Sequence, residues 1–294
     1  MSGHREYPVE NWNWDPMAVR RYGIAIGAPS SPLDERDLRL VIGENPVVFP
    51  TFAVLLADAH SLRYYPLPEL DYDPLDVIYA GHELELFGPL PARAEGSTST
   101  RLLSVGDVSS GVLVIREALS YDNAGRLLAR NVVTSIIRGA SVGHPAETRA
   151  AGGSRDEMTY DGEVIVPTLP QQAILYAQTG DENPLHWSPT AAVEGGFARP
   201  ILHGLCSYGM VAHALLREYA GRRWSLVRRI NARFTSPVTP GDTVIVRARQ
   251  DLDAIFFAAW VRQDDGSERQ VLARGELELD HVEPGAETML RRGT

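Results

Sequence analysis

The chain of 294 residues contains no lysine, so its basic side chains other than histidine are all arginines. This absence excludes reactions that proceed through a Schiff base between a lysine amine and a carbonyl substrate. Cys206 is the single cysteine, which excludes an internal disulfide framework and a cysteine-ligated metal site. Because so few cysteines are typical of a reducing compartment, we expect a cytoplasmic protein.

Long hydrophobic runs are also missing. No stretch of about 18 apolar residues occurs, so no membrane span is predicted, and the first residues lack the apolar run of a signal peptide. Acidic residues outnumber basic ones by 38 to 28, which argues against a nucleic-acid partner, since such a protein usually presents a basic face. With 44% hydrophobic residues, the chain can form one large domain or two smaller ones.

Two similar halves are predicted on either side of a linker at residues 139–157, "GASVGHPAETRAAGGSRDE". Four segments follow one another in the same order in residues 1–138 and in residues 158–294. They are the end of a helix, a long apolar helix after a proline, two strands around a proline-rich turn, and a hairpin. The same order in both halves indicates an internal duplication.

The apolar helices decide the predicted fold class. They are expected from Pro50 to about Ser61 and from Leu202 to about Tyr219, and the strands that follow them alternate as in antiparallel sheets. A single apolar helix must be covered on all sides, and a curved sheet wrapped around it does so. We therefore predict an α+β fold in which the sheets of the two halves pair edge to edge.

The segment "YAQTGDENPLH" gathers Asp181, Asn183 and His186 within six residues, with Gly180 before them and Pro184 among them. Asp and Asn favour turns and helix caps for backbone reasons alone, so a purely structural turn is one interpretation. A carboxylate and an imidazole are also the side chains that most often transfer protons in enzymes. The segment is therefore also a candidate catalytic site.

This segment, together with "RPILHGL" and "ARFTSPVTPGDT", resembles the motifs of the MaoC-like, type 2 enoyl-CoA hydratase family in its double hot-dog form. The resemblance covers essentially the whole chain. It implies two tandem hot-dog halves, each an antiparallel sheet wrapped around a central helix. It also implies reversible hydration of a trans-2-enoyl-CoA to a (3R)-3-hydroxyacyl-CoA, with no metal and no cofactor beyond the CoA of the substrate.

The resemblance also assigns the site residues. Asp181 and His186 take the water and proton steps, and the backbone N–H of Gly204 contacts the substrate carbonyl. Asn183, by the chemistry of its side chain, can hydrogen-bond to hold either partner or the substrate. His203 is a candidate for fixing the loop or binding substrate. For the CoA phosphates the candidates are Arg233 first, then Arg228 and Arg229, since Arg suits bidentate phosphate contacts. Which of Asp181 and His186 carries which proton stays open.

The first half lacks these groups. The matching turn, Gly27–Ser31, has neither a carboxylate nor a histidine, so this half is expected to be non-catalytic and to accommodate the acyl chain. An acyl-CoA thioester is the expected partner, and a homodimer is compatible with the sequence. The alternatives are a dehydratase of a polyketide or of a branched or dicarboxylic acyl thioester, a hot-dog thioesterase, and a non-catalytic acyl-CoA-binding module.

Overall fold

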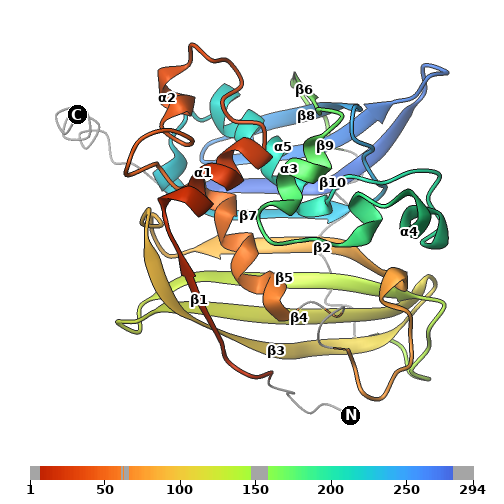
Figure 1. Ribbon diagram of the computed structural model, residues 1–294. Helices are drawn as coiled ribbons and strands as arrows, with labels where there is room; N and C mark the ends of the chain where they lie inside the picture. Colours follow the sequence, from red (N-terminus) through yellow and green to blue (C-terminus); the bar gives the residue numbers. More distant parts are fainter. Residues whose placement is uncertain (1–6, 61, 63–65, 147–157, 281–294) are drawn as a thin grey trace.

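The computed structural model describes residues 7–60, 62, 66–146 and 158–280. Within this part of the chain, one antiparallel sheet has ten strands in the order β1-β3-β4-β5-β2-β7-β10-β9-β8-β6 (Figure 1). The strands are β1 (Glu10–Trp14), β2 (Val77–Leu86), β3 (Ala94–Val108), β4 (Gly111–Asp122), β5 (Leu127–Arg138), β6 (Gly162–Pro167), β7 (Val227–Phe234), β8 (Thr243–Asp251), β9 (Ala254–Arg262) and β10 (Glu268–Leu279).

The two halves of the sheet meet at β2 and β7, which run antiparallel with His82 opposite Ala232. Outward from this junction, the first half has the order β2-β5-β4-β3-β1 and the second half has β7-β10-β9-β8-β6. The halves therefore form one continuous sheet, which confirms the predicted edge-to-edge pairing and the α+β fold class. Pairing at the junction leaves β1 and β6 as the edge strands of the described sheet.

The helices cover one face of the sheet, and α1 and α3, which occupy matching places in the two halves, lie against each other (Figure 1). The α-helices are α1 (Pro16–Ala25), α2 (Glu35–Leu38), α3 (Gln172–Ala177), α4 (Pro189–Glu194) and α5 (Gly204–Glu218). The 3-10 helices are η1 (Pro50–His60), η2 (Pro74–Asp76), η4 (Pro184–His186) and η5 (Trp224–Leu226).

Helix α5 is the buried centre of the second half, since every residue from Leu205 to Leu216 is buried. A helix that is buried around its whole circumference needs neighbours on all sides. The strands of the second half curve around it (Figure 1). The predicted helix is thus confirmed, although it begins at Gly204, after the predicted Leu202. In the first half, η1 occupies the predicted position but winds more tightly, as a 3-10 helix.

The predicted linker lies only partly within the described residues, because residues 147–157 fall outside them. Residues 139–146 continue from β5 and are tied to β3, where the Asp107 carboxylate accepts hydrogen bonds from the N–H groups of Val142 and Gly143. The domain limits predicted from the sequence stay a prediction. None of the helices in the described part of the chain is long and apolar enough to cross a membrane.

Candidate active site

The turn that follows α3 brings Asp181 and Asn183 together. It opens at Gly180, whose φ of 121° lies in the left-handed region that glycine adopts without strain. The Asp181 carboxylate accepts a hydrogen bond from the N–H of Asn183 at 3.1 Å, and Asn183 Oδ1 accepts one from the N–H of Leu185 at 3.0 Å. Both side chains therefore stabilise the backbone of the turn, whatever else they do.

His186 is nearly buried at the end of η4, and its ring orientation is fixed by one backbone oxygen. Its Nδ1 lies 2.8 Å from the carbonyl oxygen of Ile201. A carbonyl oxygen can only accept, so Nδ1 carries the hydrogen. In the neutral ring, Nε2 then has the lone pair that can take up a proton.

His203 joins the start of α5 to this turn. Its Nε2 donates to the backbone oxygen of Asp181 at 3.0 Å and lies 3.9 Å from the carboxylate oxygen Oδ2 of the same residue. The His203 ring stacks on the ring of His186, with the ring centroids 3.6 Å apart. The role of fixing the loop, one of the two considered for His203, is thus consistent with its contacts.

Gly204 is the first residue of α5, so its N–H belongs to the helix end whose amides have no intrahelical acceptor. A Cβ atom added at this position would lie 3.3 Å from the ring of Phe234, so a larger residue would crowd the pocket wall. The N-terminal end of a helix also carries a partial positive charge. This end of α5 is therefore suited to a carbonyl oxygen that gains negative charge.

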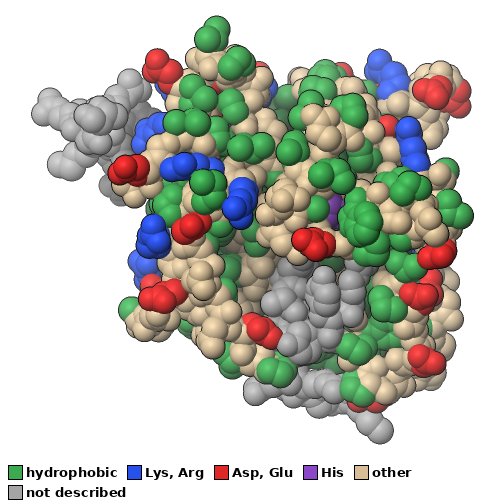
Figure 2. Space-filling model, viewed as in Figure 1, with side chains coloured by type: hydrophobic (Ala, Val, Ile, Leu, Met, Phe, Trp, Pro, Cys, Tyr) green, Lys and Arg blue, Asp and Glu red, His purple; other side chains and the backbone are tan. Residues whose placement is uncertain are grey.

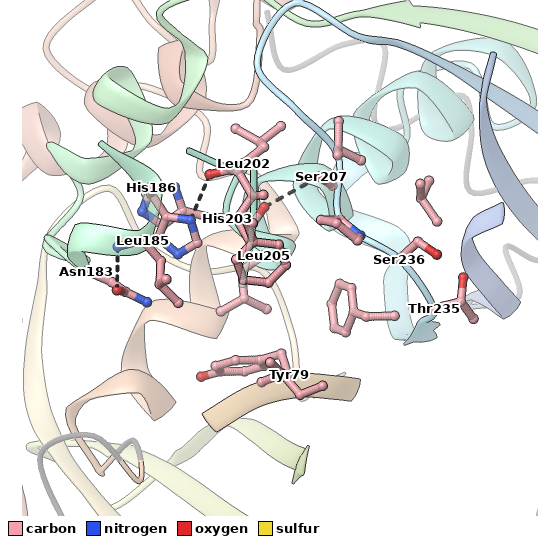
Figure 3. Close-up of a pocket in the computed structure, with 18 of the residues that line it drawn as sticks. Tyr79, Asn183, Leu185, His186, Leu202, His203, Leu205, Ser207, Thr235 and Ser236 are labelled. Atoms are coloured by element: carbon pink, nitrogen blue, oxygen red, sulfur yellow. Dashed lines mark hydrogen bonds between the residues drawn. The ribbon is translucent and has the colours of Figure 1, made fainter. Parts of the chain in front are cut away.

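These groups line one cavity of about 270 Å³ that both halves of the chain enclose. Figure 3 shows Asn183, His186 and His203 grouped on one side, Thr235 and Ser236 on the other, and Tyr79 on a first-half strand below them. The lining residues are Val77, Ile78, Tyr79, Arg138, Asp181, Asn183, Leu185, His186, Phe197, Ile201, Leu202, His203, Gly204, Leu205, Ser207, Phe234, Thr235, Ser236, Pro237, Val238, Val271 and Leu272.

Comparison with known proteins decides the family. Residues 12–139 match the MFE-2 hydratase 2 N-terminal domain, and residues 153–259 match the MaoC like domain. The enoyl-CoA hydratase ChsH3 of Mycobacterium tuberculosis is 34% identical over 248 residues, which cover 83% of this chain and 86% of that protein. The chain belongs to the MaoC-like hydratase family. The family predicted from the sequence is confirmed.

Two solved structures share the fold of this MaoC-like chain. A MaoC-like dehydratase from Phytophthora capsici has a TM-score of 0.79 at 25% identity, covering 95% of this chain and 96% of that one. Peroxisomal multifunctional enzyme type 2 from Drosophila melanogaster has a TM-score of 0.78 at 28% identity and covers 92% of this chain. This chain spans about half (48%) of the length of the Drosophila enzyme. The predicted double hot-dog fold is confirmed.

The three arginines predicted to bind CoA phosphates lie on β7 but do not line the cavity of the MaoC-like chain. Arg228 and Arg233 are exposed. Arg229 lies between two carboxylates, 2.9 Å from Glu83 and 3.0 Å from Glu278. The structure does not bring these side chains to the catalytic groups, and their role in binding phosphates stays a prediction.

Arg138 is a charged lining residue that the sequence analysis missed. It ends β5 in the first half, yet its Nη2 donates to the backbone oxygens of Leu75 and Gly195, each at 3.0 Å. Nothing in the local sequence marks this arginine, because residues distant in the chain surround it. By contrast, the alternation along β7 could have shown that Arg229 and Arg233 point away from the core that Ile230 and Ala232 enter.

The site also contains side chains of the types that bind metal ions. One ligand-type atom each from Asp181, His186 and His203 lies within 4.8 Å of the others, in the part of the chain that the structure describes. Two histidines and one carboxylate are a donor set found in catalytic zinc sites. The expectation that the protein uses neither a metal nor a cofactor therefore stays a prediction.

Proposed function

We propose that the protein is a hydro-lyase that adds water across the 2,3 double bond of a trans-2-enoyl-CoA. The product is a (3R)-3-hydroxyacyl-CoA, and the reverse dehydration uses the same groups. The observation that carries this proposal is the convergence of Asp181, His186 and the N-terminal end of α5 at Gly204 on one cavity. The family and the name of the Mycobacterium relative support it.

The chemistry needs a proton acceptor, a proton donor and a site for negative charge on the thioester oxygen. Asp181 and His186 hold one water between them and move both protons. The hydroxyl adds to C3, and a proton reaches C2, so that the elements of one water are gained. His186 accepts through Nε2, because Nδ1–H is bonded to Ile201. Which group takes the first proton is left open.

Gly204 and Asn183 complete the proposed site. The N–H of Gly204 donates to the thioester oxygen as it takes on enolate character, aided by the partial positive charge of the α5 end. Asn183 uses Oδ1 to cap η4, which leaves its Nδ2 group as the donor that orients water or substrate. His203 positions this arrangement through its bond to the Asp181 backbone.

The test is turnover of trans-2-enoyl-CoA substrates of graded length and branching, with the chirality of the product determined. Hydration to the (3R) alcohol is expected, and treatment with a metal chelator is expected to leave the rate unchanged. Release of free CoA without hydration would instead indicate a thioesterase. Binding without any reaction would indicate an acyl-CoA-binding module.

Two further parts of the proposal concern where and how the chain works. We propose a cytoplasmic enzyme, supported by its single cysteine. We also propose that a homodimer forms beyond the internal pairing of the two halves, which light scattering would test directly.

A further inference from the structure

Arg138 stands at the junction of the two halves, at the edge of the catalytic cavity. Its Nη2 is bonded to the backbone of Leu75, just before β2, and to Gly195, which follows α4. Its guanidinium also lies over the ring of Phe197, 5.9 Å from the ring centroid. The side chain is 35% exposed, so this cation is held in place and still reaches solvent.

The surroundings of Arg138 leave much of its charge uncompensated. Its acidic partner is Asp76, whose carboxylate lies 3.4 Å away and is 44% exposed, so water screens the pair. Its other acceptors are neutral carbonyls. Arg229, in contrast, sits between two carboxylates at 2.9 and 3.0 Å. Arg138 therefore keeps a capacity for a further anion that Arg229 has largely lost.

Two observations indicate where such an anion would bind. Nε of Arg138 is buried and has no hydrogen-bond partner among the described residues. Arg138 is also the one arginine among the lining residues of the cavity in the described part of the chain. Because Nε itself is closed to solvent, the anion would meet the exposed part of the guanidinium, whose charge and planar N–H groups suit a carboxylate or phosphate oxygen.

The net charge of the molecule favours a local cation at the substrate site. The chain has a net charge of −10, and Figure 2 shows acidic side chains scattered over the face that it views. A CoA thioester carries several phosphate charges, so its approach to an acidic protein is opposed unless a local cation receives it. Within the cavity lining, Arg138 is that cation.

We propose that Arg138 binds an anionic group of the thioester substrate at the rim of the catalytic cavity. This inference rests on the proposed function. Two parts of a substrate could supply the anion: a phosphate of CoA, or a carboxylate carried by the acyl chain. Both would meet the same guanidinium, and the first half of the chain thereby contributes a substrate-binding residue to the site of the second half.

The test compares wild type with Arg138→Gln on four substrates. They are a trans-2-enoyl-CoA, the same acyl group on N-acetylcysteamine, which has no phosphate, and the ω-carboxylated forms of both. The expected result is a rise in KM of about tenfold, the order of one charge-assisted hydrogen bond, with a much smaller change in kcat. A rise confined to the CoA thioesters assigns a phosphate, and a rise confined to the ω-carboxylated thioesters assigns the carboxylate.

Two results would overturn the proposal. One is an equal rise in KM for the uncharged N-acetylcysteamine thioester, which would make Arg138 only a clamp between the halves. The other is no rise for any substrate. Arg138→Lys should restore part of the lost affinity, because it keeps the charge, and high salt should narrow the difference between wild type and Arg138→Gln. Arg126→Gln, at an exposed ion pair with Asp122 in the β4–β5 turn, is the matched control and should keep the wild-type KM.

The proposed function can fail separately. If wild type turns over none of the four thioesters, the hydratase proposal is wrong. Calorimetric binding of free CoA and of the ω-carboxylated N-acetylcysteamine thioester to wild type and to Arg138→Gln then still tests the anion contact. Equal affinities of the two proteins for both ligands would refute it.

Discussion

The two halves of the sheet have the same strand order but different interiors. Every buried side chain on the second-half strands β7 to β10 is apolar. The first-half strands β2 to β5 bury polar side chains: His82, Thr98, Thr100, Arg116, Glu117, Ser120, Asn131 and Ser135. The second half keeps its buried polar groups outside its sheet, several of them at the cavity. The same strand order thus supports an apolar sheet interior in one half and a partly polar one in the other.

The central helices of the two halves differ at their first residues. Helix α5 begins with Gly204, which has a backbone N–H to offer, while η1 begins with Pro50, which has none. The first half therefore lacks at this point the donor that the second half presents to a substrate oxygen. The missing N–H supports the interpretation of the first half as non-catalytic, independently of its missing dyad.

The turns before these helices also differ. In the second half the turn carries Asp181 and His186 into the cavity. In the first half, Asp37 lies beyond the turn and is fully buried, with its carboxylate 3.2 Å from His213 Nε2 and 3.1 Å from Arg222 Nε. Ser30 also donates to it. The carboxylate that follows the first-half turn thus joins the two halves through its ion pair with Arg222 and its close contact with His213.

The largest expected effect comes from breaking the proposed dyad. Asp181→Asn keeps the size and turn preference of the residue but removes the basic carboxylate, and His186→Ala removes the other proton carrier. Each should reduce kcat roughly 10²- to 10⁴-fold, the contribution of one positioned acid or base. The double variant should be little worse than either single one, because groups that act as a unit are not additive.

Ser30→Ala, in the matching turn, is the control and should keep nearly full turnover per folded molecule. Kinetics and melting temperature should be measured on the same samples. If Asp181 and His186 only stabilise their turn, the pattern reverses: stability falls by about 1 kcal/mol, the cost of a lost cap, and turnover survives.

The next effect concerns stability, and it comes from Asp37, the buried carboxylate that follows the first-half turn. Burial raises the pKa of Asp37, but the hydrogen bonds and charges of His213, Ser30 and Arg222 outweigh it and hold this pKa well below its usual range. Asp37→Asn removes the negative charge and leaves His213 and Arg222 facing a neutral group. Unfolding free energy should fall by about 3 kcal/mol, as when one partner of a buried ion pair is removed.

Turnover per folded Asp37→Asn molecule should stay within about twofold of wild type, since the residue lies outside the catalytic cavity. Asp122→Asn is the matched control, because it breaks an ion pair with a largely exposed arginine and should cost much less than Asp37→Asn. Urea unfolding measures both variants. Equal losses for the two would show that the buried cluster does not join the halves.

Local chemistry explains which elements the sequence could predict. The hairpin predicted in the first half is β4–β5, and residues 122–125 form its turn, with the Gly125 N–H donating to the Asp122 carbonyl and a φ of 78° at Gly125. Turn residues act on their own backbone, so they can be recognised without knowledge of the fold. The start of α5 was predicted two residues early, at Leu202, from the apolar run that follows Pro200.

Contacts between distant segments explain what the sequence could not predict. Arg138 reaches the cavity only because β5 ends beside α4, and Asp37 meets Arg222 across 185 positions of sequence. Neither residue has a local pattern that distinguishes it from a solvated charge. The run of arginines on β7 suggested a phosphate site as a dense charge cluster, but the sequence did not show that Arg229 has two acidic partners. The role of these arginines in binding phosphates stays a prediction.

The smallest expected effect is a loss of stability at acidic pH, caused by His82 at the junction between the halves. His82 is buried opposite Ala232, and its Nε2 lies 2.9 Å from Asn131 Oδ1. Burial lowers the pKa of His82 to about 4, although the hydrogen bond with Asn131 acts in the other direction. The unfolded chain therefore binds a proton at His82 at higher pH than the folded chain does. Stability is complete above the unfolded pKa near 6.5 and declines as the pH falls toward 4.

For wild type, this linkage predicts a loss of roughly 2 kcal/mol in unfolding free energy between pH 7 and pH 5 from His82 alone. His82→Gln has no imidazole to protonate, so its unfolding free energy should fall by roughly 2 kcal/mol less than that of wild type between pH 7 and pH 5. His144→Gln, at an exposed position after β5, should keep the wild-type pH dependence. Urea unfolding at several pH values measures the difference. If wild type and His82→Gln lose stability in parallel, His82 takes up its proton at the same pH in the folded and the unfolded chain, and the polar interior of the first half tolerates a cation at its junction with the second.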